Sequence, residues 1–79
     1  MTTFERLEKV LNSVFDGEID AKGITEVSNL KDDVGMNSIA MLYMAMGVEQ
    51  EFGVKFKNTD LPTLVTVGDV IRCIEEKLK

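Results

Sequence analysis

The sequence predicts an all-α protein: a small four-helix bundle of three long helices and one short helix, with a long loop between the first two helices. Apolar residues recur with the helical period near both ends of the chain, and a charge-free apolar run lies between these two segments. The 79 residues, 44% of them hydrophobic, are enough for one small domain, which we expect to span residues 1–79.

The first predicted helix covers residues 4–15. Its apolar side chains share one arc, which predicts an amphipathic helix that packs on a core. Thr2 or Thr3 is the expected N-cap, and Asp16-Gly17 is expected to end the helix because glycine accepts the left-handed conformation that follows many helices. The arc consists of Phe4, Leu7, Val10, Leu11, Val14 and Phe15.

The last predicted helix begins after Thr66, whose side chain can form a capping box with Asp69. Asp69 with Arg72, and Arg72 with Glu76, are opposite charges three and four residues apart, each pair worth a few tenths of a kcal/mol. Cys73 lies at the edge of the apolar face, where we interpret it as a small buried hydrophobe without a function. The face consists of Val67, Val70, Ile71, Ile74 and Leu78.

The middle helix, residues 38–52, is unusual because residues 39–48 carry no charge. A helix that is apolar all round is normally buried on every side, which a domain of this size cannot achieve. The densest apolar arc should face the core and contains Met41, Leu42, Ala45, Val48 and Phe52. The opposite strip contains Ala40, Tyr43, Gly47 and Gln50, bordered by Met44 and Met46. Either short loops cover this strip, or it meets a ligand or a partner.

Residues 16–37 form a loop that is longer than compact domains usually contain without a functional reason. Its apolar residues are spaced irregularly, which indicates a loop pinned to the core rather than a strand. We expect a short extended link at residues 54–56 and one short helical turn capped by Asp60, with Pro62 in that turn. The loop anchors are Ile19, Ile24, Val27, Leu30 and Val34.

The composition excludes several classes of function. A net charge of −5 without a basic cluster argues against nucleic acid and anionic membranes as partners. The longest apolar run is too short to span a membrane, and the N-terminus does not resemble a signal peptide. The single cysteine, Cys73, cannot form an internal disulfide, so we expect a cytoplasmic setting.

An enzymatic function is disfavoured because the chain has no histidine and no phosphate-binding or metal-binding motif. We therefore predict no catalytic residue and no metal site. Asp16, Glu18 and Asp20 alternate in a way that suggests calcium ligands, but the sixth-position glycine and the closing glutamate of an EF-hand are absent.

Ser38 stands at the start of the unusual helix, after a glycine turn. Either Asn37 or Ser38 is expected to cap the helix. The alternative for Ser38 is a modification site, because a phosphate attached at a helix start meets free backbone N–H groups and the positive end of the helix dipole.

From residue 4 to residue 74, and most closely over residues 30–56, the chain resembles an acyl carrier protein. The core motif of that family is an acidic residue, a hydrophobic residue, glycine, any residue, aspartate, serine and a leucine-like residue. This chain reads Asp33-Val34-Gly35-Met36-Asn37-Ser38-Ile39 at that place. The segments Glu49-Gln50-Glu51-Phe52 and Thr66-Val67-Gly68-Asp69-Val70 resemble the end of the family's second helix and the start of its last helix.

The resemblance implies a 4′-phosphopantetheine arm on Ser38, installed from coenzyme A by a phosphopantetheinyl transferase. Acyl groups would ride on the arm as thioesters and be delivered to acyl-transferring or condensing enzymes that dock transiently to a monomeric carrier in fatty acid, lipid or polyketide-type biosynthesis. Met-rich apolar helices can open an adaptable cavity for such a chain. The alternatives are an aminoacyl or peptidyl carrier, whose Gly-Gly-His-Ser type of motif is absent, and an interaction module that keeps the fold without the arm.

The chain departs from the family pattern at two places. Asn37 replaces the usual aspartate before the serine, and Ala40 and Tyr43 are neutral where carriers of bacterial fatty acid synthesis are often acidic. We therefore expect a specialised carrier that recognises its partners more by shape and apolar contact. The expected partner surface contains Asp32, Ala40, Tyr43, Met44, Gly47, Glu49 and Glu51.

Overall fold

The computed structural model describes residues 2–15 and 23–79. Its elements are α1 (Thr3–Phe15), α2 (Ser38–Phe52), the 3-10 helix η1 (Leu61–Thr63) and α3 (Val67–Leu78). Within the described residues the fold is all-helical, apart from an isolated β-bridge between Asn29 and Thr66. The predicted class and the three long helices are confirmed, whereas the short fourth helix is a single 3-10 turn of three residues.

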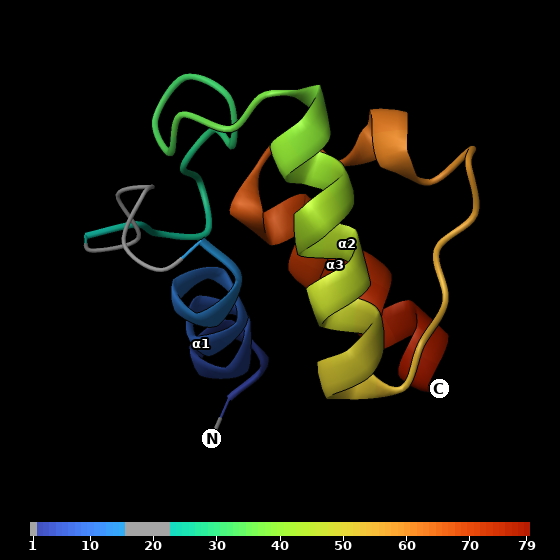
Figure 1. The fold of residues 1–79 in the computed structure, drawn as a ribbon. Coiled ribbons are helices and arrows are strands. Elements are labelled where there is room, and N and C mark those ends of the chain that lie inside the picture. The colour runs from blue at the N-terminus through green and yellow to red at the C-terminus, as the bar shows by residue number, and fades with distance from the viewer. Residues whose placement is uncertain (1, 16–22) are drawn as a thin grey trace.

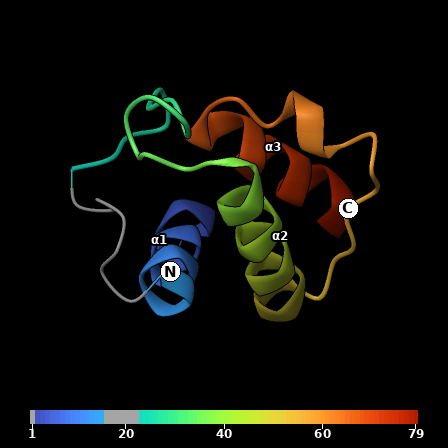
Figure 2. The same cartoon turned by 45° about the horizontal axis from the view of Figure 1, so that its top comes forward.

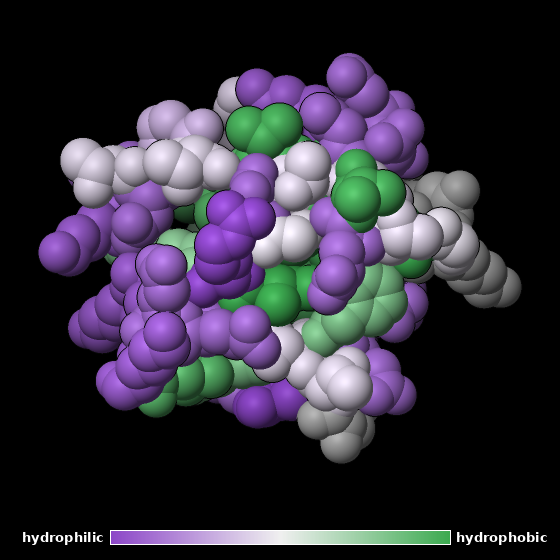
Figure 3. Space-filling view, turned by 180° about the vertical axis from the view of Figure 1, so that it is seen from behind, coloured by the Kyte–Doolittle hydropathy of each residue, from purple (hydrophilic) through white to green (hydrophobic). Residues whose placement is uncertain are grey.

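The three α-helices enclose one hydrophobic core. α1 and α2 lie side by side, and α3 crosses obliquely behind them (Figures 1 and 2). The segment after α2 returns along that helix, so that η1 lies beside the start of α2 (Figure 1). The fully buried side chains at the centre are Leu7, Leu11, Leu30, Met44, Val48, Val67, Val70 and Ile74. The face turned away from the viewer of Figure 1 is mainly hydrophilic, with small separate hydrophobic areas (Figure 3).

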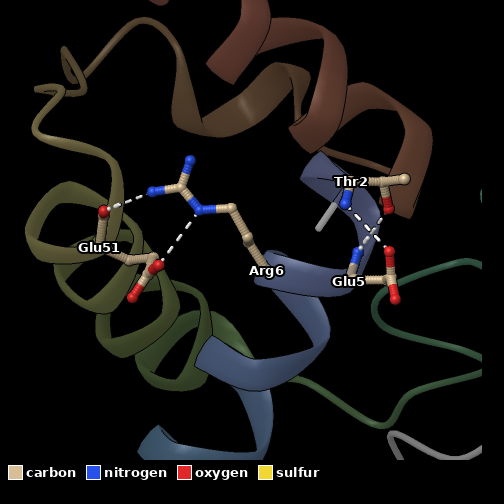
Figure 4. A network of polar contacts seen from close by, with 4 residues as sticks. All are labelled: Thr2, Glu5, Arg6 and Glu51. Atoms are coloured by element: carbon tan, nitrogen blue, oxygen red, sulfur yellow. Dashed lines mark hydrogen bonds and ion pairs between the residues drawn. The ribbon is translucent and has the colours of Figure 1, made fainter.

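Hydrogen bonds at the helix ends explain why the elements begin and end where they do. The Thr2 hydroxyl accepts from the Glu5 N–H, and the Glu5 carboxylate accepts from the Thr2 N–H, so Thr2 is the N-cap of α1 (Figure 4). The corresponding capping box of Thr66 and Asp69 begins α3, as predicted. Gly53 ends α2 at φ +69° and donates its N–H to a carbonyl of the last turn.

A polar tie joins α1 to the end of α2. The guanidinium of Arg6 donates to the Glu51 carboxylate at 3.2 Å and to the Glu51 carbonyl at 2.9 Å (Figure 4). The same guanidinium lies 4.2 Å from the centre of the Phe52 ring. Arg6 therefore covers the edge of the core as well as pairing with a charge.

α2 is rotated slightly from the predicted orientation: Met41, Ala45, Val48 and Phe52 are buried as predicted, but one edge of the buried face differs. Met44 is fully buried, whereas Leu42 is 52% exposed, so the predicted places of these two residues are exchanged. Gly47 explains the rotation: a Cβ atom there would lie 2.6 Å from Val14 and 2.9 Å from Val10, so the missing side chain lets α1 pack directly on α2. Periodicity alone could not find this, because α2 is apolar on both sides.

Two other apolar residues were wrongly predicted to be buried. Val27 is 83% exposed because it lies at the tip of the turn closed between Thr25 and Ser28. Leu78 is half exposed at the last residue of α3, beyond the core. The predicted helix stop at Asp16-Gly17 and the anchor Ile19 lie outside the described residues.

Candidate functional site

The segment before α2 is held in place by Asn29. Its side-chain oxygen accepts from the N–H groups of Lys31 and Asp32, both at 2.9 Å, and its own N–H donates to the Asp33 carboxylate at 2.7 Å. Gly35 then takes a left-handed φ of +86°, which reverses the chain toward the helix. Asp33 and Gly35 of the predicted motif therefore shape the approach to α2.

The motif residues on either side of this turn have separate tasks. Met36 is buried at 2% exposure, and its N–H donates to the carbonyl of Leu30, which fixes the entry of the chain. Asn37 is the N-cap of α2, because its side-chain oxygen accepts from the Ala40 N–H at 2.8 Å. Of the two residues predicted as alternative caps, the structure thus selects Asn37 and leaves Ser38 as the first helical residue.

Ser38 is exposed and stands at the amino end of a 15-residue helix. Within the described residues, the backbone N–H groups of Ser38 and Ile39 have no hydrogen-bond acceptor, because no helical turn precedes them. Asn37 accepts from the N–H groups of the next two residues, Ala40 and Met41. Two free donors and the positive end of the helix dipole therefore adjoin the Ser38 hydroxyl, an arrangement that favours a negatively charged substituent.

A cavity of about 460 Å³ opens beside Ser38, between the start of α2 and the segment that contains η1. Its polar lining residues are Asn29, Lys31, Asp32 and Ser38. Its apolar lining residues are Met41, Leu42, Leu61, Pro62, Leu64 and Val65. The one exposed serine at a described helix start thus borders an apolar space of the size that ligand sites have.

The expected partner surface is only partly available. Met44 is fully buried and cannot contact a partner, because the rotation of α2 turns it into the core. Gly47 is half-buried against α1, and Glu51 is engaged by Arg6. The Glu49 carboxylate accepts from the Phe56 N–H at 2.8 Å.

The remaining members of that surface, Asp32, Ala40 and Tyr43, are exposed or half-exposed, and α2 adds hydrophobic side chains that sequence reasoning did not place there. Residues 39, 42, 43 and 46 follow the i, i+3, i+4, i+7 spacing, so they share one outward side that we call the outer face of α2. Its members are Ile39, Leu42, Tyr43 and Met46, with exposed fractions of 63%, 52%, 55% and 57%. In the sequence, these residues form a second set of apolar positions with helical spacing, and this set is the signal that could have revealed the outer face.

Chemistry other than a covalent arm finds no support in the described residues. No group of three or more metal-ligating side chains occurs among them. Burial raises the pKa of the Cys73 thiol, so this side chain is a poor nucleophile. Asp16, Glu18 and Asp20, which were considered as calcium ligands and not predicted to bind a metal, lie outside the described residues. The helices of the described part are all too short or too polar to cross a membrane.

Comparison with known proteins identifies the family. Residues 5–74 match the protein family described as "Phosphopantetheine attachment site". The acyl carrier protein of Thermotoga maritima is 42% identical over 60 residues, which cover 76% of this chain and 74% of that protein. This chain belongs to the acyl carrier protein family. The acyl carrier protein of an Exiguobacterium species is 39% identical over 59 residues, covering 75% of each chain.

Solved structures agree with this assignment. The holo acyl carrier protein of Geobacter metallireducens superposes with a TM-score of 0.81 at 26% identity, covering 99% of this chain and 87% of that one. The acyl carrier protein of Enterococcus faecalis gives a TM-score of 0.72 at 31% identity, covering 98% and 99%. The chain is therefore a carrier with a covalently attached 4′-phosphopantetheine group and not an enzyme, as predicted.

Proposed function

We propose that this carrier holds acyl groups as thioesters on a 4′-phosphopantetheine arm attached to Ser38. The observation that carries the assignment is the position of the Ser38 hydroxyl, exposed at the start of α2 and on the border of the apolar cavity. The described residues include two other serines: Ser13 lies near the end of α1, and Ser28 accepts the Thr25 N–H in a turn. Neither of them is at a helix start beside a cavity.

The residues around Ser38 fit the arm. The phosphodiester would meet the free N–H groups of Ser38 and Ile39, and the neutral Asn37 leaves one negative charge fewer near it than an aspartate would. When bound, the arm supplies a thiol on which an acyl group is held as a thioester. The protein itself positions the arm and shelters the acyl group.

An acyl chain is the cargo that suits the cavity best. Six of its ten lining residues are apolar, Met41, Leu61 and Leu64 among them, so most of the lining suits an acyl chain. Lys31 and Asp32 are the charged residues of the lining. We therefore retain fatty or polyketide-type acyl groups as the cargo, with an aminoacyl or peptidyl group as the alternative.

A chemical test separates the cargo from the arm. The unmodified chain is incubated with octanoyl-coenzyme A and a phosphopantetheinyl transferase, and then with hydroxylamine, which cleaves thioesters. We expect the mass of the product to fall by the octanoyl group alone, while the arm stays on the peptide that contains Ser38. Loss of the whole arm, or attachment at another residue, would refute the proposal.

The partners include a phosphopantetheinyl transferase and acyl-transferring or condensing enzymes, and we propose that they dock on the outer face of α2. This face follows Ser38 directly and carries no charge between Ser38 and Val48. Since burial of apolar surface depends little on salt, docking should be less salt-sensitive than for a carrier with an acidic helix. A carrier with such an uncharged surface suits a dedicated pathway rather than general fatty acid synthesis. Transient docking is consistent with a carrier that is a monomer in the cytoplasm.

Tyr43→Glu tests this surface. A charge at a 55% exposed position should leave the free energy of unfolding unchanged within about 0.5 kcal/mol and weaken binding of the partner enzymes. Asn12→Glu adds the same charge to an exposed position on α1 and serves as the control. Equal effects of the two variants on pairwise binding would argue against docking on α2, and normal turnover with general synthase enzymes would argue against a dedicated pathway.

A further inference from the structure

One wall of the cavity beside Ser38 contains little regular secondary structure. α2 supplies one side through Met41 and Leu42, and the opposite wall is the short segment of residues 61–65 that contains η1. η1 has only three residues, and Asp60, which precedes it, makes no side-chain cap to it. A single 3-10 turn has little stability of its own, so the position of this wall depends on how its two ends are held.

The first end is held by Asp60. Its carboxylate accepts from the Lys57 N–H at 2.7 Å and from the Lys77 ammonium at 3.0 Å. The Lys77 side chain is only 20% exposed, and its ammonium lies 5.6 Å from the centre of the Phe56 ring. The last turn of α3 is thereby joined to the residue directly before η1.

The second end is held by a different set of contacts. The Val65 N–H donates to the Asp69 carboxylate, and the Val65 carbonyl accepts from the Leu30 N–H at 2.9 Å. The capping box of Thr66 follows at once. These contacts share no residue with the pair of Asp60 and Lys77, so either end can be released while the other stays fixed.

We propose that the ion pair between Asp60 and Lys77 fixes the first end of this wall and so sets the length of acyl chain that the cavity shelters. The proposal rests on the proposed attachment at Ser38. Neither residue lines the cavity, so both are positioning residues that act through Leu61 and Pro62. Without the pair, the first end keeps the packing of Leu61 on the core and the backbone turn at Asp60, but it loses its connection to α3, so the wall can move outward around Val65.

Three variants isolate the pair. Lys77→Met removes the ammonium and keeps an aliphatic side chain against Phe56, and Asp60→Asn removes the charge while leaving an oxygen for the Lys57 N–H. The double variant shows whether the two act together, because its effect should equal that of either single change. Arg6→Met is the matched control: it removes the cation of a partly buried ion pair, with Glu51, that shares no residue with the wall.

Amide hydrogen exchange on the chain without an arm tests the anchoring. The N–H groups of Thr63 and Leu64 donate to carbonyls at the start of the wall. In Lys77→Met and Asp60→Asn we expect their exchange to accelerate about two- to fivefold, the change expected from loss of one partly buried pair. Arg6→Met should leave it unchanged. Unchanged exchange in all variants would overturn the proposal.

Thioester protection on the loaded chain tests the cargo. The rate of hydroxylamine cleavage is measured for arms that carry butanoyl, octanoyl and dodecanoyl groups. We expect Lys77→Met to shift the best-protected chain to a longer one and to speed cleavage of the chain that the wild type protects best by about two- to fivefold. A uniform change for all lengths, or additive effects in the double variant, would show a merely structural pair and overturn the proposal. Failure of the wild type to load at all would instead refute the proposed function, while the exchange result would still stand.

Discussion

Asn37 and Ser38 are adjacent, yet the structure gives them separable roles, so only the substitution of Asn37 should lower stability. Asn37→Ala removes the oxygen that accepts from the Ala40 N–H at 2.8 Å. Loss of an N-cap lowers the free energy of unfolding by about 0.5–2 kcal/mol, and we expect about 1 kcal/mol because Asn37 is exposed and water can replace the lost bond. Ser38→Ala removes no cap, so stability should stay within about 0.5 kcal/mol.

Urea denaturation followed by circular dichroism measures both changes. A loss of about 1 kcal/mol corresponds to a midpoint lower by roughly 0.5–1 M and a melting temperature lower by about 4–8 °C for a domain of this size. Asn37→Asp keeps the cap and should be at least as stable as the wild type, because an acidic group favours a helix start. A Ser38→Ala variant that loses more stability than Asn37→Ala would refute the assignment of the cap.

Three further predictions concern the core and the ionic contacts. Gly47→Ala places a Cβ 2.6 Å from a Val14 methyl group. The overpacking should cost about 1–3 kcal/mol and outweigh a gain in helix propensity of about 1 kcal/mol. Calorimetry should therefore show a lower melting temperature, which adding Val14→Ala restores in part. Phe52→Ala empties a site that is 7% exposed and should lower the free energy of unfolding by about 3–5 kcal/mol in urea, whereas a near-neutral result would contradict its burial. Hydrogen bonds from the Thr66 and Val65 N–H groups lower the pKa of Asp69, so the stability that its carboxylate contributes should be present above the ordinary value of 3.8 and lost as the pH falls through the folded-state pKa. Asp69→Asn should flatten this loss of stability in melting curves recorded at acid pH.

Local signals predicted the ends of the helices well. The capping box at Thr66 and the glycine after Phe52 act between neighbours in the chain, so their spacing alone predicted the start of α3 and the end of α2. The same holds for Ser38, which the motif placed at a helix start and which the structure shows exposed there.

Contacts between distant residues could not be predicted in this way. Whether Leu42 or Met44 faces the core depends on Gly47 meeting α1, a contact between segments more than thirty residues apart. Likewise, Asp60 and Lys77 look like ordinary surface charges in the sequence, and only the return of the chain along α2 brings them to 3.0 Å. The cavity depends on the same return, so its existence was predicted but its walls were not.

The central claim is that Ser38 bears the arm, and intact-protein mass tests it most directly. The wild type, Ser38→Ala and the control Ser13→Ala are each incubated with coenzyme A and a broad-specificity phosphopantetheinyl transferase. We predict a gain of one phosphopantetheine on the wild type and on Ser13→Ala, and no gain on a folded Ser38→Ala variant. The same gain on Ser38→Ala, or no gain on the folded wild type, would contradict the account.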